Sequence, residues 1–169
     1  MAQKLNADLK AEGEDMIEPL IKVIEVPCSQ KNAFDVFLDK METWWPLGKF
    51  TVSAMAGQPA KGIRVDAREG GVITEIGSDG TEVQWGTIRV LDRYARLVMD
   101  FHIPRPGDVV TTRPLLELDF VAMGPTQTRV TLTQSNFEAL GDMGAPVRGG
   151  YGFGWTMIFE GGYKAACGG

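Results

Sequence analysis

The chain has 169 residues, of which 44% are hydrophobic and 23% charged, with a formal net charge of -5 at pH 7. These values are ordinary for a folded globular protein and exclude a disordered or fibrous chain. The excess of acids argues against nucleic-acid binding, which requires clustered Lys and Arg. Apolar runs are shorter than the roughly 18 residues that cross a bilayer, so we expect no membrane partner.

The first residues differ in character from the rest of the chain. Residues 1–16 carry four acids and little apolar periodicity, which predicts a flexible N-terminal arm ahead of a folded part over residues 17–169. This arm does not resemble a secretory signal, so we expect a cytoplasmic protein. Cys28 and Cys167 belong to no CxxC motif or Cys/His cluster. We therefore expect reduced thiols, no zinc and no cofactor.

A strand and a helix open the folded part. The β-branched residues of 21–26 predict a strand that ends at Pro27, which lacks the N–H needed for a ladder. Ser29 is a suitable N-cap for a helix. Its apolar positions follow the helical period and end at Pro46: Phe34, Phe37, Leu38, Met41, Trp44 and Trp45. Residues 49–60 then form a loop or a short second helix.

From Gly62 onward the hydrophobic period changes from about 3.6 residues to 2, which indicates strands. Six segments follow, at 62–67, 71–77, 82–91, 97–103, 115–122 and 128–137. Most connections are short hairpins, and these force antiparallel neighbours because a parallel crossover needs a dozen or more residues. With the first strand, we expect one strongly twisted antiparallel sheet of about seven strands.

The last predicted element is a helix over residues 146–163. One wide apolar stripe runs along it: Val147, Tyr151, Trp155, Ile158 and Phe159. Such a face must be buried, and the sheet is its natural partner, which gives an α+β fold with a curved sheet around a long C-terminal helix. Glycines at 149, 150, 152 and 154 leave room either for close packing or for a ligand, and both interpretations remain open.

Three stretches together resemble a known family. The first runs from residues 25–29 to residues 44–46, and the second covers residues 80–86. The third runs from residues 129–133 to residues 150–155. They are similar to the activator of heat shock protein 90 ATPase homologue-like branch of the START-like (SRPBCC) superfamily, which includes polyketide cyclases and lipid-transfer proteins. The resemblance covers about residues 17–163. It implies a single START-like domain with the helix-grip fold in the order β-α-α-β6-α, and a deep cavity between sheet and helix that relatives use for apolar or aromatic molecules.

Aromatic residues are the strongest candidates for the wall of such a cavity, because apolar sites are lined by aromatics with a few orienting polar groups. Plain core packing is the competing interpretation. Tyr151 is the expected polar handle, and Trp85 is expected either on the wall or facing outward into a homodimer interface. The candidate ligand-binding residues are Trp45, Trp85, Met99, Phe101, Leu118, Phe120, Tyr151 and Trp155.

Catalytic and metal-binding constellations are sparse in this sequence. His102 is the only histidine. Strand alternation places it on the face opposite Phe101, which favours a surface or structural role over general acid/base catalysis. Asp100, Glu117 and Asp119 are expected in solvated positions on the convex side of the sheet. We therefore predict no catalytic residue and no metal site.

The leading hypothesis is a non-catalytic protein that binds a small hydrophobic or aromatic ligand between the sheet and the C-terminal helix. One alternative, suggested by the family name, is co-chaperone binding to heat shock protein 90 in the stress response. Another is a cyclase or hydrolase acting on an aromatic or polyketide-like substrate, with His102, Asp100 or Tyr151 as the acid/base group. The sequence leaves the ligand, the cavity size and the oligomeric state open.

Overall fold

A computed structural model describes residues 16–169, so the predicted N-terminal arm lies outside the described part apart from its last residue. Seven strands form one sheet in the order β1-β7-β6-β5-β4-β3-β2, and every neighbouring pair is antiparallel. The predicted sheet is confirmed. Its strands are β1 (Leu20–Val26), β2 (Gly62–Val65), β3 (Val72–Ile76), β4 (Glu82–Asp92), β5 (Arg96–Phe101), β6 (Leu115–Gly124) and β7 (Gln127–Ser135).

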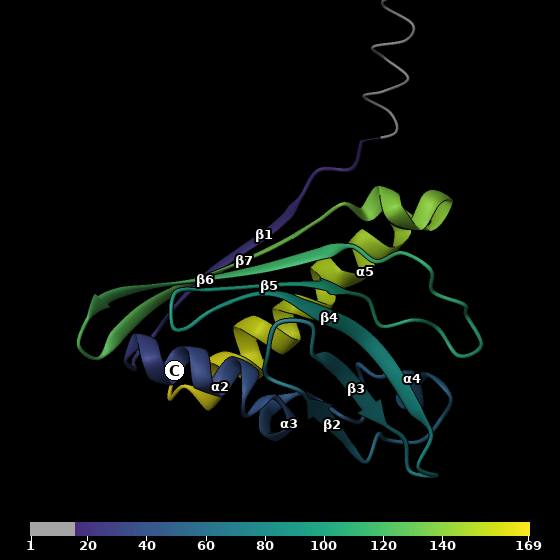
Figure 1. Ribbon diagram of the computed structural model, residues 1–169, viewed down its shortest axis with the longest axis horizontal. Coiled ribbons are helices and arrows are strands. Elements are labelled where there is room, and N and C mark those ends of the chain that lie inside the picture. Colours follow the sequence, from purple (N-terminus) through teal and green to yellow (C-terminus); the bar gives the residue numbers. More distant parts are fainter. Residues whose placement is uncertain (1–15) are drawn as a thin grey trace, which may run out of the picture.

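The C-terminal helix lies across one face of the curved sheet, and the chain ends beside α2 (Figure 1). This is the predicted helix-grip arrangement. No helix within residues 16–169 has the length and apolar character needed to span a bilayer. The helical segments are α2 (Gln30–Leu38), α3 (Met41–Trp44), α4 (Val52–Met55), the 3-10 turn η1 (Phe137–Met143), α5 (Gly144–Met157), the π-helical η2 (Ile158–Tyr163) and α6 (Lys164–Ala166).

Helix α2 begins where the sequence predicts. The Ser29 hydroxyl accepts a hydrogen bond from the Asn32 N–H at 3.1 Å and so caps the first turn. The expectation of one helix continuing to Trp45 is wrong, because Lys40 leaves the helical region (φ -115°, ψ 20°). The chain folds back there, and the Trp44 Nε1–H donates to the Val36 carbonyl at 2.7 Å. This buried bond holds α3 against α2.

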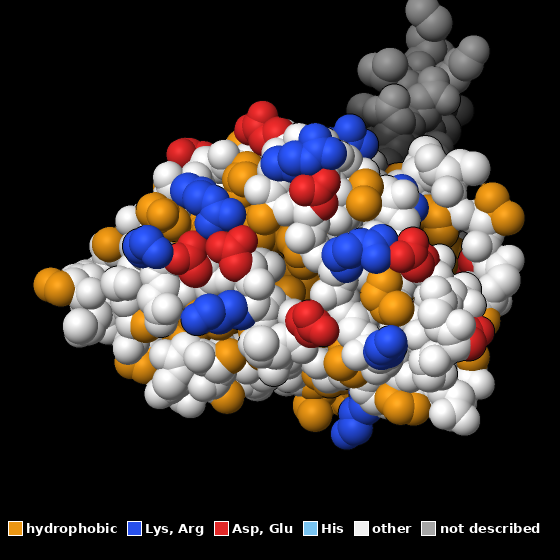
Figure 2. Space-filling model, turned by 60° about the horizontal axis from the view of Figure 1, so that its bottom comes forward, with side chains coloured by type: hydrophobic (Ala, Val, Ile, Leu, Met, Phe, Trp, Pro, Cys, Tyr) orange, Lys and Arg blue, Asp and Glu red, His pale blue; other side chains and the backbone are white. Residues whose placement is uncertain are grey.

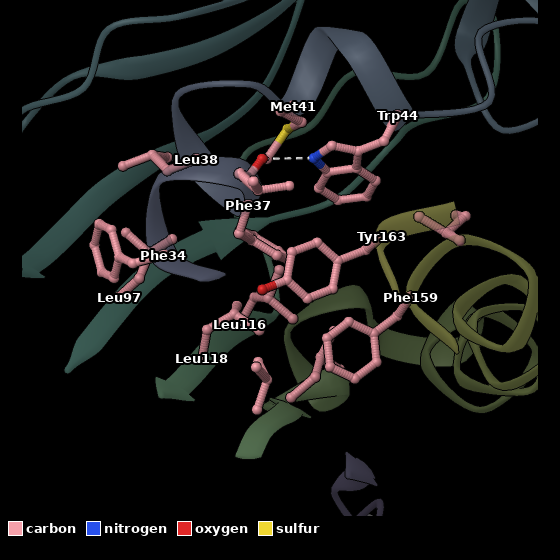
Figure 3. Close-up of a cluster of buried hydrophobic side chains, with 14 of the residues drawn as sticks. Phe34, Phe37, Leu38, Met41, Trp44, Leu97, Leu116, Leu118, Phe159 and Tyr163 are labelled. Carbon is pink, nitrogen blue, oxygen red and sulfur yellow. Dashed lines mark hydrogen bonds between the residues drawn. The ribbon is translucent and has the colours of Figure 1, made fainter. Parts of the chain in front are cut away.

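A cluster of buried side chains joins the C-terminal helix to α2 and to the sheet. Figure 3 shows Tyr163 lying between Phe37 and Phe159, with sheet residues beneath them. The Tyr163 ring is stacked on Phe159 with centroids 5.6 Å apart, and its hydroxyl donates to the Ala33 carbonyl at 2.6 Å. Gly162 lets the C-terminal helix approach α3 closely, since a Cβ there would lie 3.0 Å from the Trp44 carbonyl oxygen.

Replacing Tyr163 with Phe tests this anchor. The variant keeps the ring but loses the hydroxyl that donates to Ala33, so we expect the free energy of unfolding to fall by about 1–2 kcal/mol. Urea denaturation measures the change. Tyr94→Phe is the matched control, because Tyr94 is half-buried and packs its ring edge-on against Phe34 at 5.8 Å. Its expected change lies within about 0.5 kcal/mol, and equal losses in the two variants would contradict the anchor.

Candidate functional site

A hollow of about 540 Å³ opens beside the C-terminal helix. Its walls come from α5 and η2, from η1, from the segment around α4, and from the loop between β5 and β6. The volume lies within the range of small-molecule sites, roughly 300–1,000 Å³. Apolar side chains from all four walls face the hollow: Phe50, Met55, Ile103, Val110, Leu140, Val147 and Ile158.

Two of the four predicted glycines of α5 line the hollow. A Cβ built at Gly150 would meet open space, whereas one at Gly154 would contact the Phe50 ring at 3.8 Å. Gly149 also has open space around its Cβ position but does not belong to the lining. Gly150 therefore leaves free volume on the lining, whereas a Cβ at Gly154 would make only ordinary van der Waals contact, so close packing does not require glycine at either position.

Tyr151 and His102 form a polar pair on the lining. The Tyr151 hydroxyl lies 3.1 Å from His102 Nδ1 and accepts a hydrogen bond from the Ile103 N–H at 2.8 Å. The predicted outward position of His102 is wrong, since this side chain is only 9% exposed. Strand β5 ends at Phe101, so the alternation that placed His102 on the outer face no longer applies to it.

The environment keeps both members of this pair neutral. Burial lowers the pKa of His102 from its ordinary value of 6.5, and the positive charge of Arg113 acts in the same direction, while Asp108 opposes it. Burial also raises the pKa of Tyr151 well above its usual range, and the hydrogen bond from Ile103 offsets this only in part. A phenol and an uncharged imidazole therefore face the hollow near neutral pH.

The predicted aromatic wall lies mostly behind the hollow. Trp45 packs on Trp85 and Trp155 with ring centroids 4.9 and 5.9 Å away, and Phe101 lies 5.8 Å from Trp155. Tyr151 stacks on Trp155 at 5.8 Å and is the member of the predicted set that lines the hollow. The sheet residues of that set lie in the buried core: Met99, Leu118 and Phe120.

The alternative position of Trp85, outward in a dimer interface, is wrong. Trp85 is fully buried, and its Nε1–H donates to Glu75 Oε1 at 3.0 Å. Glu75 is 1% exposed and accepts from the backbone N–H groups of Val52 and Ser53, both at 2.8 Å. This carboxylate ties α4, one wall of the hollow, to β3. Sequence reasoning missed Glu75, since an acid in a strand is normally assigned to the solvent face.

The other strand carboxylates have structural partners. Glu117 and Asp119 both pair with Arg96, at 2.7 and 3.0 Å, in half-buried positions. The solvated position predicted for Asp100 is wrong, because this residue is 9% exposed and accepts from Arg89 Nε at 2.9 Å. Within residues 16–169, no three His, Cys, Asp or Glu side chains come together in a way that could hold a metal ion.

Cys28 and Cys167 are both free and buried. Burial raises the pKa of the Cys167 thiol to about 12, so this sulfur stays protonated near neutral pH.

On the molecular face drawn in Figure 2, acidic and basic side chains are interspersed, with hydrophobic ones between them. That face therefore offers no continuous basic surface to a nucleic acid.

The sequence profile of one family matches most of the chain. It is described as Activator of Hsp90 ATPase homolog 1-like protein, and the match covers residues 27–161. The chain belongs to this family. No curated protein matches the chain.

Solved structures agree with membership of the Activator of Hsp90 ATPase homolog 1-like family. The self-sacrificing resistance protein CalC from Micromonospora echinospora is 27% identical, with a TM-score of 0.65 over 88% of this chain and 93% of its own. The anthrahydroquino-γ-pyrone synthase Txn09 is 28% identical, with a TM-score of 0.56 over 79% and 86%. Protein NE0264 from Nitrosomonas europaea shares the fold at 15% identity, with a TM-score of 0.56 over 90% and 94%.

The buried imidazole of His102 predicts that the stability of the protein depends on pH. Because the pKa of His102 is lower in the folded chain than in the unfolded one, the unfolded chain takes up the extra proton. The stability that the neutral His102 side chain contributes is fully present above pH 6.5. It is lost as the pH falls from there toward the pKa of His102 in the folded chain. Urea unfolding at several pH values measures it.

The His102→Gln variant is the control, since other groups that titrate in this range are the same in both proteins. We expect the difference in unfolding free energy between wild type and variant to shrink as the pH falls below 6.5. A pH-independent difference would show that burial does not hold His102 neutral.

Proposed function

We propose that this protein binds a small apolar or aromatic molecule in the hollow beside its C-terminal helix, without converting it chemically. The observation that carries the proposal is the hollow itself, about 540 Å³ of space with apolar walls and the Tyr151–His102 pair on its lining. Apolar walls supply affinity through burial of ligand surface, and a few polar groups orient the ligand.

Hydrogen bonding around the pair favours recognition over catalysis. In the described chain, the side-chain bonds of Tyr151 and His102 join these two residues and the Ile103 backbone, and neither contacts a carboxylate. A general base works best when its pKa lies near the operating pH and a partner orients it. Burial instead lowers the pKa of His102 and raises that of Tyr151, so both pKa values move away from neutral pH, and His102 becomes a weaker base and Tyr151 a weaker acid.

The comparisons support an aromatic ligand. Txn09, 28% identical over 79% of this chain, is named as a synthase of an anthrahydroquino-γ-pyrone, which is a fused aromatic product. Flat rings of this kind suit a wall in which Tyr151 stacks on Trp155 at 5.8 Å. We propose that the remaining predicted wall residues support the lining from behind: Trp45, Trp85, Met99, Phe101, Leu118, Phe120 and Trp155.

Filling the hollow from α5 tests the binding function. A Gly150→Leu side chain enters the open space on the lining, so we expect an apolar fluorescent dye such as Nile red to bind at least about tenfold more weakly. The substitution also replaces a helical glycine and should raise stability by up to roughly 1 kcal/mol. Titration of dye fluorescence gives the dissociation constants.

Gly149→Leu is the matched control, because Gly149 neighbours Gly150 on the same helix, has open space at its Cβ position and lies outside the lining. It should bind the dye like wild type. Native mass spectrometry of the purified protein extends the test to ligands retained from the cell. Equal dye affinity in wild type and Gly150→Leu would exclude this hollow as the binding site.

A second candidate function follows from the family description, which names activation of the Hsp90 ATPase. If the protein acts as a co-chaperone, saturating amounts should accelerate ATP hydrolysis by purified Hsp90, and Gly150→Leu should do so as well as wild type. If ligand binding is its role, the ATPase rate stays unchanged. Steady-state phosphate release separates the two candidates.

A further inference from the structure

The hydrogen bonds around Tyr151 determine where its proton lies. A backbone N–H can only donate, so the contact with Ile103 at 2.8 Å uses the Tyr151 oxygen as an acceptor. The hydroxyl still carries one hydrogen to donate. His102 Nδ1, at 3.1 Å, is the acceptor in reach. With this hydrogen directed at His102, Nδ1 is the unprotonated ring nitrogen.

This assignment fixes the other ring nitrogen as well. A neutral imidazole carries one N–H, and with Nδ1 occupied as an acceptor that hydrogen sits on Nε2. Among the described residues, no group accepts a hydrogen bond from Nε2. His102 lines the hollow, so Nε2–H is the polar hydrogen that its ring offers to a ligand.

Two arginines near His102 face carboxylates. Arg105 pairs with Asp108 at 3.1 Å, and Arg113 faces Asp100 at 3.8 Å. Asp100 also pairs with Arg89, so it neutralises Arg113 only in part, but Arg113 does not belong to the lining. Lys49 and Arg105 are exposed cations on the lining, and Lys49, which has no ion pair among the described residues, is the group that would select an anion instead.

We propose, on the basis of the binding function above, that the hollow selects apolar or aromatic molecules that carry a neutral carbonyl oxygen, such as a ketone or quinone. The carbonyl accepts a hydrogen bond from His102 Nε2–H. Tyr151 is a positioning residue that fixes the tautomer of His102. In the described part of the chain, His102 Nε2 has no protein partner and is not fully buried, so a ligand that covers it without accepting its hydrogen leaves it unsatisfied, at the cost of about one hydrogen bond.

Three naphthalene probes of similar size test the proposal: 1-acetylnaphthalene, its hydrocarbon analogue 1-ethylnaphthalene, and 1-naphthoate. We expect wild type to bind the ketone roughly three- to tenfold more tightly than the hydrocarbon, the value of one ordinary hydrogen bond. His102→Phe should remove this preference while keeping affinity for 1-ethylnaphthalene. Isothermal titration calorimetry gives the dissociation constant of each protein for each probe.

The tautomer provides a readout that a purely structural role would not affect. The chain has one histidine, so selective ¹⁵N labelling gives the two ring nitrogens of His102 alone. In wild type we expect a protonated Nε2 and a bare Nδ1. In Tyr151→Phe both tautomers should be populated, and the ketone preference should shrink.

The outcomes are distinct. If none of the probes binds, both the binding function and this inference fail. If the ketone and the hydrocarbon bind equally, the binding function stands and the inference is overturned. Tightest binding of 1-naphthoate would overturn it in favour of anion selection by Lys49, and a protonated Nδ1 in wild type would overturn the hydrogen-bond assignment.

Discussion

The fold depends on how the C-terminal helix is held against the concave face of the sheet. Trp155 is the central contact, since it is fully buried among aromatic rings and its Nε1–H donates to Gln134 Oε1 on β7 at 2.8 Å. At the far end of the helix, Tyr163 reaches Ala33. Burial of rings this large provides most of the driving force, and the two hydrogen bonds fix the register of the helix on the sheet.

The hollow follows from this attachment. Aromatic side chains fill the space between α5 and the sheet, and the hollow lies beside the helix, toward the β5–β6 loop and α4. The cavity implied by family resemblance lay under the helix, whereas the observed one is displaced to its flank. Glu75 makes this flank stable, because its buried carboxylate satisfies the otherwise unpaired N–H groups at the start of α4.

Sequence reasoning reached the fold because the strands and the two longest helices, α2 and α5, are encoded by local periodicity. The alternation in β6 and β7, the Ser29 cap and the stripe on α5 are all properties of a few neighbouring residues. Most of the site was beyond this reasoning. Whether His102 and Trp85 point inward depends on where β5 ends and on a buried acid, Glu75, contributed by another strand. Tyr151 was identified because it combines a helical position with a polar tip.

The pairing of the first and last strands has a consequence for biosynthesis. Leu20 lies opposite Gln134, and Val26 opposite Thr128, so the edge of the sheet joins segments more than a hundred residues apart. Contacts this distant in the chain slow folding, since the intervening loop must close before they form. The helix that completes the core follows all seven strands along the chain. A nascent chain therefore exposes its apolar sheet face until this helix has been synthesised.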